Sequence, residues 1–213
     1  PESNGRSSSV ATDPLAPAPV EAPKPEAPPA TVPGEGLFAE IKTAKGTIVC
    51  QLEYTLTPMT VASFVALAQG KHPYVTTVEK TKHFYDGLTF HRVAPDFVIQ
   101  GGDPSGNGSG GPGYMFPEEI VPTLKHDKAG TMAMARTPAR GSNGSQFYFT
   151  LKDTPFLDGD YTVFGHVVSG MEVVKAIQQG DKMESVTIVA KGKDAEAFDA
   201  VKVLEANKDK FKH

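Results

Sequence analysis

The sequence predicts a mainly β domain that carries two short helices and follows a proline-rich segment. Short runs rich in Phe, Tyr, Val and Thr recur between residues 38 and 191, separated by turns that contain glycine or proline. Such a series of short strands favours a closed barrel or a sandwich. Helical spacing of apolar residues occurs in that region at 58–69 and 170–180. The 213 residues leave room for one domain with a sizeable core and additional tails.

Residues 1–36 differ in composition from everything that follows. They contain nine of the 18 prolines, together with Ala, Ser and Glu and few large apolar residues. A segment of this kind cannot bury enough apolar surface to offset the entropy lost on ordering. We therefore expect a disordered Pro/Ala-rich tether over 1–36, a folded domain over 37–191 and a C-terminal extension over 192–213.

The first predicted elements of the folded domain are a hairpin and a helix. Apolar and polar residues alternate in FAEIKT and GTIVCQLE, which flank the turn TAKG. The stretch TPMTVASFVALAQG predicts a helix over 58–69 that begins at Pro58 or Thr60 and ends at Gly70. The expected apolar face of this helix consists of Val61, Phe64, Val65 and Ala68.

Six further strands and two more helices complete the prediction. The strand candidates are LTFHRV, DFVIQGG, GTMAMA, SQFYFTL, YTVFGHVV and SVTIVAK. The stretch GMEVVKAIQQG predicts a helix over 170–180. Residues 194–210 place apolar side chains among charges, which predicts an amphipathic C-terminal helix. Those side chains are Phe198, Val201, Val203 and Leu204.

Charge and cysteine content exclude several classes of protein. The net charge is −4: residues 1–36 carry two basic and five acidic groups, and the remainder carries 19 basic and 20 acidic groups. The sequence shows no basic stripe of the kind that binds nucleic acid. It has no apolar run near the ~18–20 residues of a membrane helix. Cys50 is the single cysteine, so no intrachain disulfide can form, and its place in a predicted strand indicates a buried, inert thiol.

Three possible chemistries fail on their patterns. The glycine-rich run 101–113 lacks the spacing of a phosphate-binding loop and precedes no predicted helix. Five histidines are spaced by 11, 8, 35 and 40 residues, which matches no compact metal-ligand pattern. The string GSNGSQ does not form the strand–GxSxG–helix elbow of a serine hydrolase. We therefore expect neither a metal nor a cofactor.

The string FHRVAPDFVIQGGD sets an arginine in an otherwise apolar run. Arg92 lies among residues that favour burial, whereas arginine is rarely buried without a partner. One interpretation is a structural ion pair with Asp86 or Asp103. The other is a cation that lines a binding groove.

Three strings resemble the cyclophilin family of peptidyl-prolyl cis–trans isomerases, in particular its bacterial branch. They are FYDGLTFHRVAPDFVIQGGD, GSNGSQFYFTL and FLDGDYTVFGHVVSGMEVVKAI, and they occur in the order that the family has. The resemblance covers about residues 37–190. It implies a closed eight-stranded antiparallel β-barrel capped by two helices, and isomerase activity without a cofactor.

The resemblance also implies a site. Arg92 matches the catalytic arginine of the family, and Gln100 matches the glutamine beside it. The remaining matched positions are implied to bind the prolyl substrate. They are His91, Phe97, Val98, Ala135, Arg136, Gln146, Tyr148, Phe156, Leu157 and Tyr161.

This chain departs from the family pattern at several of these positions. Phe156 stands where many members have a Trp that supports cyclosporin binding, so we expect weak binding of cyclosporin. Tyr148 stands where a pocket Phe is usual, and a buried hydroxyl there would need a partner. Tyr161 replaces a frequent His, Val98 a frequent Met, and Arg136 a frequent Asn.

The expected function is isomerisation of X–Pro bonds in peptides and in unfolded or folding proteins. An alternative is a non-catalytic prolyl-peptide binding or chaperone module on the same fold, and a third is a tethered assembly factor. We expect a monomer that binds no nucleic acid. A proline- and alanine-rich spacer favours the periplasm or cell envelope over the cytoplasm, with an upstream signal or anchor removed.

Overall fold

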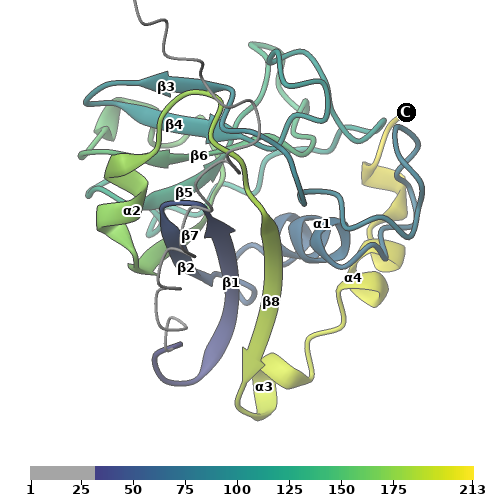
Figure 1. The fold of residues 1–213 in the computed structure, drawn as a ribbon. Coiled ribbons are helices and arrows are strands. Elements are labelled where there is room, and N and C mark those ends of the chain that lie inside the picture. Colours follow the sequence, from purple (N-terminus) through teal and green to yellow (C-terminus); the bar gives the residue numbers. More distant parts are fainter. Residues whose placement is uncertain (1–31) are drawn as a thin grey trace, which may run out of the picture.

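The computed structural model describes residues 32–213, so the predicted tether lies almost wholly outside the described residues. Eight strands form one sheet in the order β3-β4-β6-β5-β7-β2-β1-β8, and every paired neighbour is antiparallel (Figure 1). The strands are β1 (Gly36–Thr43), β2 (Gly46–Leu52), β3 (Arg92–Ala94), β4 (Val98–Gly101), β5 (Thr131–Met134), β6 (Phe147–Thr150), β7 (Val163–Ser169) and β8 (Ser185–Lys191).

The helices are short and lie beside the sheet. Helix α1 lies between β8 and α4, and α2 contacts β2 (Figure 1). Two 3₁₀ turns, η1 and η2, complete the described elements. The bounds are α1 (Pro58–Ala68), η1 (Pro155–Leu157), α2 (Met171–Ala176), α3 (Lys193–Glu196), α4 (Ala200–Ala206) and η2 (Lys208–Lys210).

Each of the eight predicted strands corresponds to an observed strand. The predicted hairpin is confirmed, because β1 and β2 pair from Leu37 opposite Leu52 to Thr43 opposite Gly46. The candidate LTFHRV is the least accurate, since β3 begins only at Arg92. The residues before Arg92 form hydrogen bonds outside the regular ladders instead.

Closure of the sheet into a barrel stays a prediction. The outermost strands in the order are β3 and β8. The segments that precede these two strands do exchange backbone hydrogen bonds: Phe90 N–H donates to Asp181 O at 2.8 Å, and Met183 N–H donates to Leu88 O at 2.8 Å. An isolated bridge also joins Thr89 to Lys182.

Helix α1 is buried on all sides, whereas its sequence predicts a single apolar face. Every residue from Met59 to Ala68 is buried, because the helix packs between the sheet and α4. Phe64 contacts three aromatic rings, with centroid distances of 4.9, 5.5 and 5.6 Å to Tyr85, Phe147 and Phe164. The small residues of the helix account for this burial, since Ala and Ser allow close approach on the faces that are not strongly apolar.

The ends of the helices differ from the prediction. Helix α2 ends at Ala176, not near residue 180, because Ile177 adopts an extended conformation and is buried. The single C-terminal helix expected over 194–210 is wrong, because the structure has two short helices there. Between them Asp199 is extended and caps α4, accepting a hydrogen bond from the Lys202 N–H at 3.1 Å. Phe198 packs edge-on against Tyr54 at this break.

The described fold begins slightly before the expected boundary at residue 37. Val32 is buried against Phe38 and Val49. The Lys191 Nζ donates a hydrogen bond to the Val32 carbonyl at 2.8 Å, and Gly36 already belongs to β1. Of the last five residues expected in the tether, Val32 is therefore packed and Gly36 belongs to β1, whereas residues 33–35 are described but exposed.

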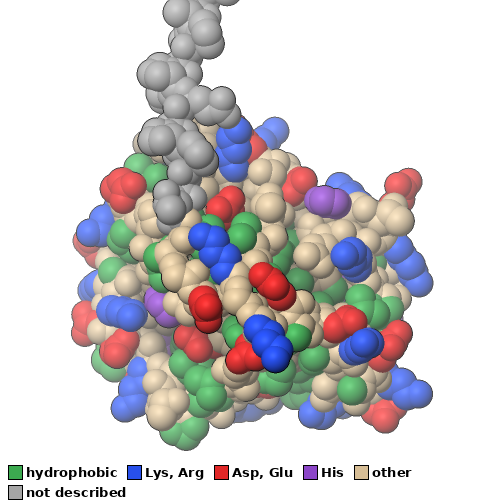
Figure 2. Space-filling model, turned by 90° about the horizontal axis from the view of Figure 1, so that it is seen from below, with side chains coloured by type: hydrophobic (Ala, Val, Ile, Leu, Met, Phe, Trp, Pro, Cys, Tyr) green, Lys and Arg blue, Asp and Glu red, His purple; other side chains and the backbone are tan. Residues whose placement is uncertain are grey.

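The described surface carries mixed charge. On the face that Figure 2 shows, basic and acidic side chains are interspersed and do not gather into a patch of one sign. Within residues 32–213, no helix has both the length and the apolar character that crossing a bilayer requires.

Candidate active site

A cavity of about 250 Å³ lies at the β3–β4–β6 end of the sheet. Its walls come from these three strands, from η1 and from the segments around residues 135 and 161. All nine residues that line it belong to the set that the sequence resemblance implies. They are Arg92, Phe97, Val98, Gln100, Ala135, Arg136, Tyr148, Leu157 and Tyr161.

Arg92 is exposed on β3, directly opposite Gln100 on β4. Its Nη1 donates a hydrogen bond to Gln100 Oε1 at 3.3 Å. The guanidinium carbon lies 5.9 Å from the centroid of the Phe97 ring, near the limit of a cation–π contact. Successive strand residues point to opposite faces, so the cation projects from the sheet while its apolar neighbours turn toward the protein.

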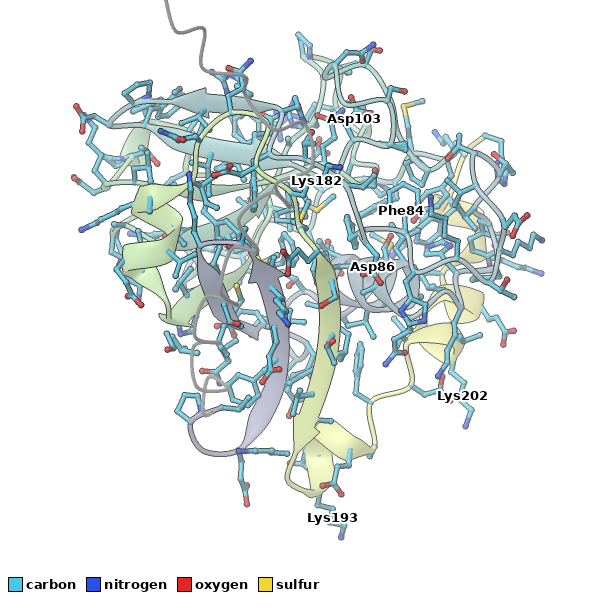
Figure 3. All side chains as sticks on the ribbon, viewed as in Figure 1. Phe84, Asp86, Asp103, Lys182, Lys193 and Lys202 are labelled. Carbon is cyan, nitrogen blue, oxygen red and sulfur yellow. The ribbon has the colours of Figure 1, made fainter. Side chains whose placement is uncertain are left out.

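The alternative interpretation of Arg92, a structural ion pair, is wrong because both acids bond elsewhere. Asp86 Oδ1 accepts a hydrogen bond from the Val186 N–H at 3.0 Å. Asp103 accepts from backbone N–H groups of its own loop, including that of Ser105 at 2.7 Å. Figure 3 shows Asp86 beside α1 and β8, and Asp103 among the loops above the sheet.

A chain of polar groups fixes the glutamine that holds Arg92. Gln100 Nε2 donates to Gln146 Oε1 at 2.9 Å. Gln146 Nε2 in turn donates to the carbonyls of Gly108 and Gly110 at 3.0 and 2.9 Å. The orientation of the Gln100 amide, and therefore the acceptor that it offers to Arg92, depends on the conformation of the loop over 103–110.

Asp103 organises that loop. Its carboxylate, almost completely buried, accepts from the N–H groups of Ser105, Asn107 and Gly108 at 2.7, 3.1 and 2.5 Å. Burial raises the pKa of Asp103, but the backbone hydrogen bonds outweigh it, so the pKa lies below the ordinary value of 3.8. The glycine-rich run 101–113 is thus a loop folded around one carboxylate.

The floor of the cavity is a small apolar cluster separate from the main core. Val98, Ala133, Tyr148 and Val163 form its buried part, and Phe97, Leu157 and Tyr161 pack against it. Phe156 is 68% exposed and stacks on Phe97, with ring centroids 5.7 Å apart and planes at 28°. Phe156 therefore forms part of the rim of the cavity.

The hydroxyl of Tyr148 has the partner that its burial requires. Tyr148 Oη lies 2.9 Å from His126 Nε2, and His126 Nδ1 lies 2.8 Å from Asp158 Oδ1. Burial raises the pKa of Tyr148, so the phenol stays protonated. The ring of Tyr148 lines the cavity while its hydroxyl is engaged by His126, and the added oxygen leaves the pocket wall apolar.

Arg136 lies between this cavity and a larger one of about 750 Å³, and it lines both. Its Nε is 3.0 Å from Glu118 Oε1, and both side chains are largely buried. Its guanidinium carbon lies 4.8 Å from the Tyr161 ring centroid. The larger cavity is also lined by Gln146 and by the C-terminal residues Lys212 and His213.

Two positions implied by the resemblance lie outside both cavities. His91 lines neither of them, and its buried Nδ1 has no hydrogen-bond partner among the described residues. Phe156 reaches the site only through Phe97. The sequence did not predict the roles of His126, Asp158 and Glu118, because their partners are distant in the chain. His126 is 22 residues from Tyr148 and 32 from Asp158, and Glu118 is 18 residues from Arg136.

The remaining reactive side chains lie apart from the site. Cys50 is fully buried in β2, and burial raises the pKa of its thiol, as expected of an inert cysteine. In the part of the chain that the structure describes, no three His, Cys, Asp or Glu side chains come together in a way that could hold a metal ion.

We predict that Asp103→Asn lowers the free energy of unfolding at pH 7 by about 1.5 to 3 kcal/mol, the range of hydrogen bonds to a charged group. The folded-state pKa of Asp103 is depressed, so its stabilisation is complete above the ordinary value of 3.8 and is lost as the pH falls through the folded-state pKa. Urea unfolding of both proteins at pH 7 and pH 3 measures this. An equal difference in the free energy of unfolding between wild type and Asp103→Asn at both pH values would contradict the prediction.

Comparison with known proteins agrees with this geometry. Residues 38–206 match the family model described as cyclophilin type peptidyl-prolyl cis-trans isomerase/CLD. The chain is similar to peptidyl-prolyl cis-trans isomerase B of Streptomyces anulatus, with 45% identity over 148 residues, 67% of this chain and 84% of the relative. A peptidyl-prolyl cis-trans isomerase of Helicobacter pylori is 42% identical over 151 residues, 70% of this chain and 85% of the relative.

Solved structures give the same result. A cyclophilin type peptidyl-prolyl cis-trans isomerase of Cryptosporidium parvum superposes with a TM-score of 0.62 at 28% identity, covering 73% of this chain and 98% of the other. A second structure of that protein, determined in the presence of the dipeptide Ala-Pro, superposes with a TM-score of 0.59. The chain therefore belongs to the cyclophilin family and is a peptidyl-prolyl cis–trans isomerase.

Proposed function

We propose that Arg92 accelerates X–Pro isomerisation by donating a hydrogen bond to the proline nitrogen of the twisted amide. The observation that carries this proposal is the position of Arg92 at the edge of a cavity with an apolar floor, where Gln100 holds it and no acid within residues 32–213 pairs with it. A cation so placed has donors free for a substrate, since arginine carries five N–H groups.

The chemistry of the amide explains why such a donor helps. The planar amide has a rotation barrier of ~18–20 kcal/mol because its C–N bond is partly double. In the twisted state that conjugation is lost, and the nitrogen regains a lone pair that accepts a hydrogen bond. A donor in this place stabilises the transition state more than the planar ground state, as catalysis requires.

The expected contribution of Arg92 is substantial but partial. A hydrogen bond to a charged group contributes about 1.5–3 kcal/mol, which corresponds to roughly 10- to 150-fold in rate. The cavity supplies the rest by holding the proline ring among Phe97, Val98, Tyr148 and Leu157 and by excluding water. Rotation about the bond then occurs beside the held ring, at the edge of the cavity that Arg92 and Gln100 line.

The alternative, a non-catalytic prolyl-peptide binding or chaperone module, requires the same cavity but no oriented donor. The chain of bonds from the 103–110 loop through Gln146 and Gln100 to Arg92 orients one. A groove for binding alone gains nothing from holding a guanidinium through two successive glutamine side chains and the loop carbonyls behind them, so the geometry favours catalysis.

For the substrate class, we propose peptides and unfolded or folding proteins that expose X–Pro bonds. Arg92 lines the cavity and is exposed, and the exposed Phe156 stacks on the lining residue Phe97, so a peptide chain bound there has exposed side chains to contact on either side. We also propose that the protein acts as a monomer, since the cavity has its donor and its apolar walls within a single copy of the fold and needs no residue from a second.

For localisation, we propose the periplasm or cell envelope, ahead of the cytoplasm. The support is compositional: the proline- and alanine-rich segment over 1–36 has the character of a spacer ahead of a folded domain. Fractionation of the source cells, with detection of the protein in each fraction, tests the localisation. The molar mass of the purified protein, measured by light scattering, tests the oligomeric state. Recovery in the cytoplasm, or a dimer mass, would contradict the respective proposal.

Arg92→Ala is expected to lower kcat/KM for a prolyl test peptide by at least 10-fold and up to about 150-fold. The fold should survive, because Arg92 is exposed and is not part of the core. Arg92→Lys should recover little, since an ammonium does not reproduce the planar guanidinium. The measurement is peptide isomerisation by each variant, with thermal unfolding as the folding control.

Two results for these variants would contradict the proposed role. Full activity of Arg92→Ala would show that the guanidinium does not act on the amide. Loss of the folded state would show that Arg92 is structural. Phe97→Ala supplies the contrast, since it removes a wall of the cavity and should weaken peptide binding together with rate.

Weak binding of cyclosporin is expected, and Phe156→Trp should strengthen it. The Trp that many family members have at this position provides an indole N–H and a larger ring, whereas Phe156 offers only an exposed phenyl on Phe97. One added hydrogen bond corresponds to a gain of about 2- to 12-fold. Calorimetric titration of both proteins tests this, and equal, tight affinities would refute it.

A further inference from the structure

His126 makes four hydrogen bonds and is completely buried. Its backbone N–H donates to Asp158 Oδ1 at 2.7 Å, and its backbone carbonyl accepts from the Thr154 N–H at 2.8 Å. Its ring nitrogen Nδ1 is hydrogen-bonded to Asp158 Oδ1 at 2.8 Å, and Nε2 is hydrogen-bonded to Tyr148 Oη at 2.9 Å. One side chain thus joins strand β6 to the segment over 154–158.

That segment carries one wall of the proline pocket. Between its two attachments to His126 lies η1, with Phe156 at the rim and Leu157 in the lining. Tyr148 lines the same cavity from β6. The Asp158–His126–Tyr148 chain therefore connects two walls of one cavity from behind.

The donor and acceptor at each link follow from the chemistry. Burial raises the pKa of Asp158, but hydrogen bonds from the backbone and ring of His126 outweigh it, so the pKa lies below the ordinary value. An ionised carboxylate only accepts, so His126 Nδ1 carries a hydrogen. When the ring carries only that hydrogen, Nε2 accepts and the Tyr148 hydroxyl donates to it.

We propose that His126 is a positioning residue of the isomerase: it fixes the distance between Tyr148 and the turn that bears Leu157, and so the width of the proline pocket. The proposal rests on the isomerase function described above. It adds a residue that touches neither the substrate nor Arg92, and that lines neither the proline pocket nor the larger cavity.

The position of Arg92 makes the expected effect selective. Arg92 is held from the other side, through Gln100 and Gln146, and shares no hydrogen bond with His126. A change in pocket width should therefore weaken the grip on the proline ring while the donor to the amide keeps its place. His126 variants should raise KM and the peptide Kd, with kcat nearly unchanged.

The first test is His126→Asn, whose amide can still donate to Asp158 but cannot reach Tyr148. The Kd of a short prolyl peptide, measured by NMR titration, should rise about 3- to 10-fold, within the range of one lost hydrogen bond. The value of kcat should stay within about 2-fold. His126→Gln, whose carbonyl can still accept from Tyr148, should show a smaller rise in the peptide Kd. If His126→Asn does not fold, His126→Gln is the variant whose Kd tests the proposal.

A double-mutant cycle separates positioning from general stability. If His126 acts through Tyr148, adding His126→Asn to Tyr148→Phe should raise the Kd by less than about 2-fold further. The matched control is His72→Asn. His72 is equally buried and is bonded to Ser63 at 3.3 Å, yet it does not line the proline pocket. This control should lower thermal stability and leave the Kd unchanged.

Three results would overturn the proposal: an unchanged Kd in folded His126→Asn, effects of His126→Asn and Tyr148→Phe that multiply in the double variant, or an equal rise in Kd for His72→Asn. The Kd does not depend on turnover. A wild type that binds the peptide without isomerising it would refute the proposed function alone, and the Kd series would still decide the role of His126.

Discussion

The site depends on the register of the β3–β4 hairpin. Pairing Arg92 with Gln100 directs the cation away from the apolar face of its strand and gives it a neutral acceptor. Successive strand residues face opposite sides, so a shift of one residue would turn Arg92 inward and set it opposite Ile99 or Gly101 in place of Gln100. The carboxylate of Asp103 supports this register indirectly, because the loop that it organises supplies the carbonyls that anchor Gln146.

Two separate supports converge on one cavity. A polar chain from the 103–110 loop orients Arg92, and a second chain from Asp158 through His126 anchors Tyr148. In the mechanism proposed above, the first chain serves the reacting amide and the second serves the proline ring. This separation explains how a chain with Tyr148 in place of the usual Phe keeps an apolar pocket, because the hydroxyl is bonded behind the wall.

Sequence alone predicts the strands and most of the pocket, since alternation places the strands and the family strings name all nine lining residues. The sequence does not predict features that depend on tertiary packing. Helix α1 is apolar enough on one face to be recognised, but its burial on every side depends on α4, which is far away in the chain. His126 escaped notice because a lone histidine has no local pattern, and its partners become neighbours only when β6 and η1 meet.

We propose that Arg92 acts on the twisted amide and not on the binding of the peptide. The most direct measurement is the rate of cis–trans exchange of a prolyl peptide bound to saturated protein, observed by NMR exchange spectroscopy for wild type and Arg92→Ala. In Arg92→Ala we expect the exchange rate on the protein to fall about 10- to 150-fold, while the peptide Kd changes by less than about 3-fold. An unchanged exchange rate, with the whole loss in Kd, would contradict it.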